Sequence, residues 1–160
     1  MEKTSGTMVV IMVVAILTGI FIAAKCATAG ETSRDGHFVA YDNGTVLDTR
    51  TNLMWAAKDN GSNVNWAQAK SYCENYSGGG YMDWRMPTQD ELAGLYDGSV
   101  KGHNGWKLTT LITLTACCPW ASEVRSSGTS AASVSFAEGD RFWTPKSVAL
   151  YRALPVRSGK

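Results

Sequence analysis

Three cysteines follow an apolar N-terminal segment, at Cys73, Cys117 and Cys118, and their thiols offer the most reactive chemistry in the chain. Thiolates are nucleophiles and bind soft metals such as Cu(I). Cys117 and Cys118 are adjacent, however, and neighbouring side chains point in different directions, so a shared copper site is disfavoured. In an oxidising compartment we expect one disulfide, and the odd count leaves one thiol over.

Other catalytic patterns are missing from the sequence. It contains no H-E-x-x-H, no G-x-S-x-G, no phosphate-binding loop and no dinucleotide fingerprint. The two histidines, His37 and His103, lie in polar surroundings that suggest exposure. Asp42-Asn43-Gly44 is too short for a calcium loop and predicts a hairpin turn instead. We therefore expect no enzyme, no cofactor and no metal.

The N-terminus predicts a targeting segment. Met8 to Ala24 is almost wholly apolar, and Ala27-Thr28-Ala29 has the small-x-small pattern of a cleavage site. We expect residues 1–29 to be a signal peptide and the protein to be periplasmic or extracellular. The alternative is an uncleaved membrane anchor formed by residues 8–24. Lys25 disfavours lipidation of Cys26.

Charge limits the partners of the mature chain. Removal of residues 1–29 takes away Glu2, Lys3 and Lys25, so 13 basic and 13 acidic residues remain. A neutral chain gives no field that would attract nucleic acid, which we exclude as a partner. Basic residues are concentrated near the C-terminus: the late basic stretch, residues 141–160, contains five of them and no acidic residue.

Periodicity and caps predict an α+β domain. A polar, flexible lead-in is expected over residues 30–36, and the domain itself over 37–160. Short strands are expected at 37–41, 45–47, 132–136, 141–143 and 149–156, and residues 53–55 are expected to return to the core. Two helices are expected, each begun by a capping box: Asn65 with Gln68, and Thr88 with Glu91.

The stretch GGYMDWRMPTQDEL, Gly79 to Leu92, ends one helix and starts the next. It resembles the G-G-Y-x-D-W-R-L-P-T-x-x-E-L signature of the Lcl C-terminal domain family, and the resemblance extends over about Tyr41 to Arg157. It implies a C-type-lectin-like fold, with two short helices packed on small antiparallel sheets. Within the signature, Asp83 and Arg85 are expected to brace the loop around Trp84, although Arg85 could also hold an anion.

The family takes its name from a bacterial surface adhesin, so the resemblance implies a binding module for sulfated or otherwise acidic glycans. The positions expected to bind them are Arg141, Lys146, Arg152 and Arg157. Two alternatives remain: a thiol and copper enzyme related to the formylglycine-generating enzymes, which share the fold, and a structural module that contacts a surface protein.

The resemblance also bears on the disulfide. In the family the cysteine equivalent to Cys73 resembles one that pairs with a terminal V-R-C cysteine, but Leu154 stands at that position here. Cys73 is therefore expected either to stay free or to pair with Cys117 or Cys118, and we take the pairing as the prediction.

Overall fold

The computed structural model describes residues 29–159. Two antiparallel sheets and two helices build the domain, which confirms the expected α+β class. In chain order the elements are β1 (Glu31–Asp35), β2 (Phe38–Tyr41), β3 (Thr45–Asp48), β4 (Leu53–Ala56), α1 (Trp66–Glu74), α2 (Gln89–Leu95), β5 (Trp120–Val124), β6 (Ser130–Val134), β7 (Arg141–Pro145) and β8 (Val156–Ser158), with single 3₁₀ turns η1 (Gly78–Gly80) and η2 (His103–Gly105).

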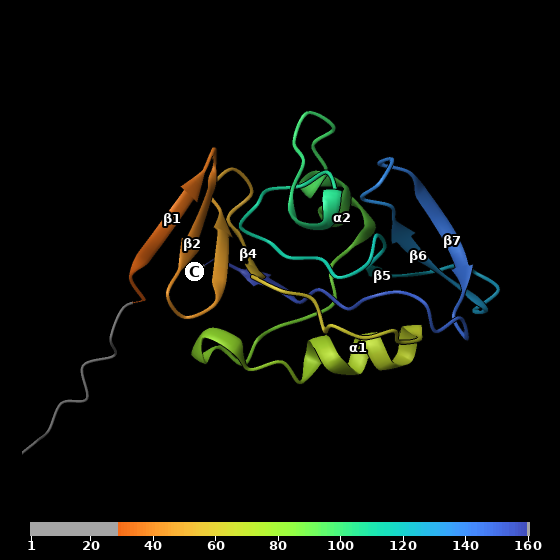
Figure 1. The fold of residues 1–160 in the computed structure, drawn as a ribbon. Coiled ribbons are helices and arrows are strands. Elements are labelled where there is room, and N and C mark those ends of the chain that lie inside the picture. Colours follow the sequence, from red (N-terminus) through yellow and green to blue (C-terminus); the bar gives the residue numbers. More distant parts are fainter. Residues whose placement is uncertain (1–28, 160) are drawn as a thin grey trace, which may run out of the picture.

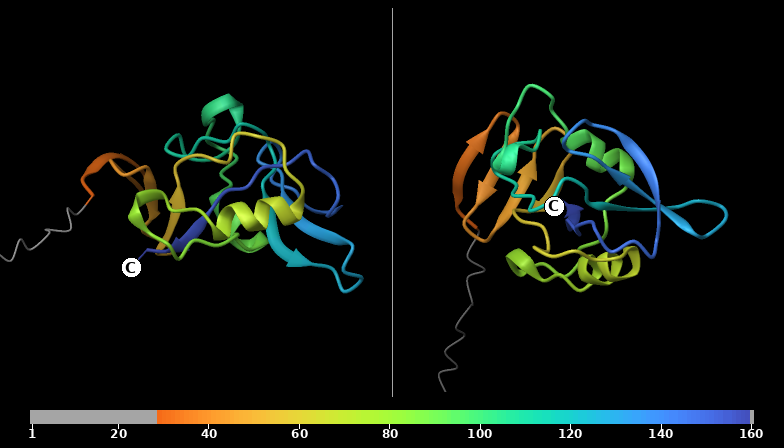
Figure 2. Two further views of the ribbon diagram at one scale, coloured as in Figure 1. Left: turned by 90° about the horizontal axis from the view of Figure 1, so that it is seen from below. Right: turned by 45° about the vertical axis from the view of Figure 1, so that its right-hand side comes forward.

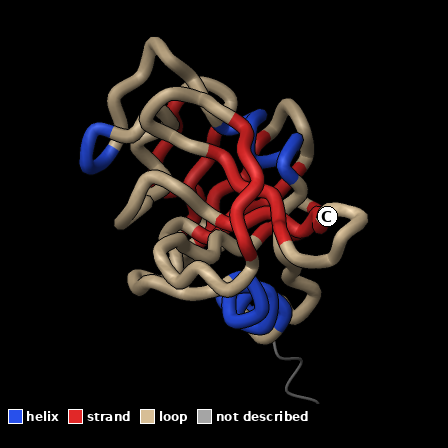
Figure 3. Tube along the Cα trace, turned by 90° about the vertical axis from the view of Figure 1, so that its right-hand side faces the viewer, coloured by secondary structure: helices blue, strands red, loops and turns tan. Residues whose placement is uncertain are grey.

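The first sheet has five strands in the order β1-β2-β3-β4-β8, and the second has three in the order β5-β6-β7. The five-stranded sheet lies on one side of the molecule and the three-stranded sheet on the other, with α2 between them and α1 beneath (Figure 1). Seen from the side of the smaller sheet, α1 appears end-on below the strands (Figure 3). The turn between β5 and β6 projects away from the body (Figure 2).

Both predicted capping boxes are present. The Asn65 side chain accepts from the Gln68 backbone N–H at 2.9 Å, and Gln68 Oε1 accepts from the Asn65 N–H at 3.0 Å. Thr88 and Glu91 make the equivalent pair at 3.1 and 2.8 Å. Each box satisfies two N–H groups that the first turn of a helix leaves without partners.

The main core fills the space between the two sheets. Leu92 and Leu95 of α2 enter it beside Trp55 of β4 and Val134 of β6, and all four side chains are buried. A second cluster lies between α1 and the three-stranded sheet, where Ala69 and Cys73 pack with Trp120. The helices are short, so this burial supplies stability that their length cannot.

Two expectations about the chain ends are wrong. Residues 30–36 are not a flexible lead-in: Glu31–Asp35 form β1, paired with β2. The Gly30 carbonyl accepts from the Asp42 backbone N–H, and the Gly30 N–H donates to the Asp42 carboxylate. The last strand is also shorter than expected. Only Val156–Ser158 form the strand that pairs with β4. Tyr151 and Arg152 instead make isolated bridges to Val64 and Pro119, and Pro155 has no N–H to donate.

Candidate functional site

Arg152 and Arg157, two of the four predicted glycan-binding residues, are held by carboxylates. Arg157 is buried and binds Asp83 through two nitrogens at 2.6 and 3.0 Å, with its guanidinium 3.9 Å from the centre of the Tyr81 ring. Arg152 lies with Nε 3.7 Å from the buried carboxylate of Asp59. These two guanidinium groups therefore have structural partners within the described chain.

The other two predicted residues, Arg141 and Lys146, are more exposed. Arg141 pairs with Asp90 at the start of α2, and Lys146 lies over the Trp66 ring at 4.9 Å from its centre. The late basic stretch thus forms separate contacts with four different parts of the fold. The structure does not gather it into one basic surface, and its role in binding stays a prediction.

The signature stretch is used for structure. Trp84 is buried and donates from Nε1 to the carbonyl of Gly78 at 3.1 Å, while Arg85 makes a bidentate contact with Glu91 at 2.6 and 2.7 Å. Asp83 is taken by Arg157, as described above. The polar residues of the signature therefore brace the passage between the two helices, as expected.

The predicted disulfide of Cys73 is wrong. Cys117 and Cys118 are bonded to each other, and Cys73 is an unbridged thiol. Cys73 points from α1 into the apolar cluster that contains Trp120, and burial, with a smaller contribution from Glu74, raises its pKa to about 12. A thiol in this environment is neutral and unreactive.

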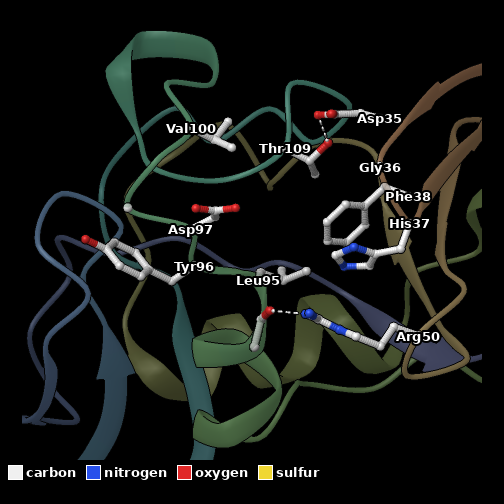
Figure 4. Close-up of a pocket in the computed structure, with 12 residues that line it drawn as sticks. Asp35, Gly36, His37, Phe38, Arg50, Leu95, Tyr96, Asp97, Val100 and Thr109 are labelled. Atoms are coloured by element: carbon white, nitrogen blue, oxygen red, sulfur yellow. Dashed lines mark hydrogen bonds between the residues drawn. The ribbon is translucent and has the colours of Figure 1, made fainter.

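A cleft of about 300 Å³ opens at the other end of the molecule, beside α2. The β1–β2 turn, with Asp35 and His37, forms one wall, and the end of α2 with Asp97 in the loop after it forms another (Figure 4). Arg50, from the turn between β3 and β4, lies at one edge with its guanidinium directed at the Gly94 carbonyl (Figure 4). Charged or titratable side chains from three separate segments meet here.

Arg50 differs from most arginines of the described chain, because no carboxylate lies within ion-pair distance of it. The one hydrogen bond from its guanidinium runs from Nη2 to the Gly94 carbonyl at 3.4 Å, which is long. Its backbone, in contrast, is fixed: Asp48 accepts from the Arg50 N–H at 2.9 Å and from the Thr51 hydroxyl at 2.7 Å. A rigid turn therefore presents a guanidinium with most of its donors unused.

Two carboxylates face the same cleft. Asp97 Oδ1 accepts from the Ser99 hydroxyl at 2.6 Å and from its backbone N–H at 2.9 Å. These bonds, together with the nearby Arg50 and His37, hold the pKa of Asp97 below its usual value, so it stays ionised. Asp35 Oδ2 accepts from the Thr109 hydroxyl at 2.7 Å. The second oxygen of each carboxylate makes no hydrogen bond within residues 29–159.

His37 completes the cleft. The centre of its ring lies 4.2 Å from that of Phe38, with the two planes tilted by 36°, and its Nε2 lies 3.5 Å from Asp48 Oδ1. This nitrogen is buried and has no hydrogen-bond partner among the described residues. Of the cleft residues, only His37 stands out in the sequence, as one of its two histidines. Arg50, Asp35 and Asp97 stand in ordinary polar turns, and only the fold brings them together.

The Lcl C-terminal domain family model matches residues 44–157 of this chain. The chain belongs to this family. Its two helices and two antiparallel sheets are accordingly a C-type-lectin-like fold. Comparisons with curated proteins and with solved structures gave no match.

The family match has a limit that matters for the cleft. Asp35 and His37 lie before residue 44, so one wall comes from a hairpin that precedes the matched region. Family membership therefore does not define what the cleft holds, and its ligand has to be argued from this chain's own residues.

Proposed function

We propose that this protein is an exported binding module of the Lcl C-terminal domain family, and that it holds an acidic saccharide in the cleft between the β1–β2 turn and α2. The observation that carries the proposal is Arg50 at the edge of a concave site, since its guanidinium has no carboxylate partner among residues 29–159. Arginine binds carboxylate and sulfate through two parallel hydrogen bonds, which gives both affinity and orientation.

This proposal moves the binding residues away from the late basic stretch. Three of the four predicted residues already have a carboxylate partner within the protein, namely Arg141, Arg152 and Arg157. That partner offsets the positive charge that an external anion would need. Lys146 has no carboxylate partner in the described chain, but it lies over the ring of Trp66, the first residue of α1. Arg50 has the stronger claim because it combines unused donors with a cleft.

The thiol and copper alternative receives no support from the cysteines. Copper needs thiolates, whereas Cys73 is buried with a pKa of about 12 and the other two sulfurs are bonded to each other. Among the described residues no group of three or more His, Cys, Asp or Glu side chains is placed to hold a metal ion.

Calorimetric titration of residues 30–160 with acidic and neutral saccharides tests the proposal. Arg50→Gln should weaken binding at least tenfold, because a charge-assisted bidentate contact is lost. Arg125→Gln is the matched control: Arg125 also lacks a carboxylate partner in the described chain, but it lies over Trp143, away from the cleft. Equal effects of the two substitutions, or no binding by the wild type, would rule the proposal out.

A further inference from the structure

The cleft has a charge pattern that selects among acidic saccharides. Apart from His37, the charged side chains of the lining are the guanidinium of Arg50 and the two carboxylates of Asp35 and Asp97, which oppose it. The cleft thus carries one site for an anion and a slight excess of negative charge. Beyond the lining, Asp48 adds a buried carboxylate behind His37.

A ligand with several anionic groups is a poor fit for this pattern. If one group binds Arg50, any second one in a space of about 300 Å³ comes close to Asp35 or Asp97. Like charges at such distances repel each other strongly, because the protein walls screen them less than bulk water does. A polysulfated chain would therefore gain one favourable contact and suffer several unfavourable ones.

Hydroxyl groups, in contrast, suit the two carboxylates. Asp97 uses Oδ1 to bind Ser99, and Asp35 uses Oδ2 to bind Thr109, so one oxygen of each is left to accept a hydrogen bond. An ionised carboxylate can only accept, and a sugar hydroxyl is a donor of the right kind. The volume is at the lower end of the range for small-molecule sites, as expected for a single ring.

We propose that the cleft selects one sugar ring bearing a single carboxylate and free hydroxyls, the uronic acid class, and discriminates against polysulfated saccharides. Arg50 binds the carboxylate of the sugar, and Asp97 and Asp35 accept from its hydroxyls. This inference rests on the proposed function, since it names the ligand class for the same site.

Asp97 provides the decisive variant. Asp97→Asn removes the negative charge but keeps an oxygen that can accept from Ser99, so the loop should stay in place. We expect glucuronate binding to weaken about tenfold, as one charge-assisted acceptor is lost, and binding of a polysulfated disaccharide to strengthen. Asp140→Asn, an exposed position outside the cleft, is the control and should change neither.

The experiment is a titration of the mature domain and its variants with glucuronate, glucose and a polysulfated disaccharide, at about 0.15 M salt to keep screening constant. Preference for glucuronate, lost in Arg50→Gln and shifted toward the sulfated ligand in Asp97→Asn, is the expected result. Tighter binding of the sulfated disaccharide by the wild type, or an Asp97→Asn variant with unchanged preference, overturns the inference and leaves the proposed function standing. Binding of none of the ligands overturns both.

Discussion

The thiol of Cys73 lies between α1 and the second sheet, fully buried and with its pKa raised to about 12 by burial and by Glu74. The thiol therefore stays protonated at pH 8, and iodoacetamide has no path to a fully buried sulfur. We expect no reaction of residues 30–160 with iodoacetamide in native buffer, and one modified cysteine after unfolding without reductant. Mass spectrometry of the intact protein measures this, and rapid modification of the native protein would contradict it.

Arg152 and Arg141 allow a second prediction, because one is enclosed and the other exposed. Arg152→Gln leaves the Asp59 carboxylate, which is fully buried, without its cation, and should lower the free energy of unfolding by about 2–4 kcal/mol. Arg141→Gln breaks a surface pair and should change it by less than about 1 kcal/mol. Urea unfolding of the two variants compares them directly. If the two variants lost equal free energy of unfolding, burial of the ion pair would not determine its contribution to stability.

At this scale the sequence shows which residues carry charge but not which charges meet. The late basic stretch has no acidic residue in it, yet Arg141 and Arg157 find their carboxylates 51 and 74 positions earlier in the chain. Arg50 gives the opposite case. It stands in a turn with Asp48, and nothing in the sequence shows that its side chain stays unpaired.

The first turn of α2 joins a capping box to an ion pair, and Glu91 takes part in both. Burial alone would raise the pKa of Glu91, but the Arg85 guanidinium and the Thr88 N–H and hydroxyl outweigh it and lower the pKa. A lowered folded-state pKa means stability that is present above the unfolded value of about 4.3 and is lost as pH falls through the folded-state pKa.

Glu91→Gln tests this linkage, because glutamine can keep the capping box and removes only the charge. At pH 7 the variant should be less stable by about 1 kcal/mol, and the difference should fade as pH drops below about 4. Thermal unfolding followed from pH 7 to pH 3 measures it. Glu74→Gln, on the exposed face of α1, is the control and should stay within about 0.5 kcal/mol at every pH. A constant deficit for Glu91→Gln would show that the charge is not responsible.

Elements that depend on neighbours in sequence were predictable, and those that depend on distant partners were not. The capping boxes of α1 and α2 lie within four residues each, and both predictions are confirmed. Strand β1 has four exposed residues out of five, so it lacks the apolar alternation of a strand and exists because β2 pairs with it. The same is true of the cleft, whose walls come from four segments.

At the scale of the whole molecule, the proposed cleavage site after Ala29 lies two residues before β1, which begins at Glu31. Residues 1–28 lie outside the described structure. Gly30, which cleavage after Ala29 would make the first residue, donates its N–H to Asp42 Oδ1 at 3.0 Å. Cleavage would convert that amide into an ammonium group beside a carboxylate, a stronger contact than the one it replaces.

We therefore predict that the mature protein begins at Gly30. N-terminal sequencing of the periplasmic or secreted fraction decides the matter, and recovery in membranes alone with Met1 intact would contradict it. No helix within residues 29–159 is long and apolar enough to cross a bilayer. An Asp42→Asn variant is expected to lower the melting temperature of the processed form, since the new ammonium group loses its carboxylate.

The placement of β8 has a consequence for how the chain reaches this fold during synthesis. Strand β4 pairs on one side with β3, which precedes it directly in the chain. On its other side it pairs with β8, where Arg157 lies opposite Met54 and is 103 positions later in the sequence. Until the ribosome has released that strand, one edge of the larger sheet stays open and Val156 cannot fill its place in the core. Nascent chains halted before residue 150 should thus be digested by a protease that spares the finished protein, and protection of such a chain would show that the core closes earlier.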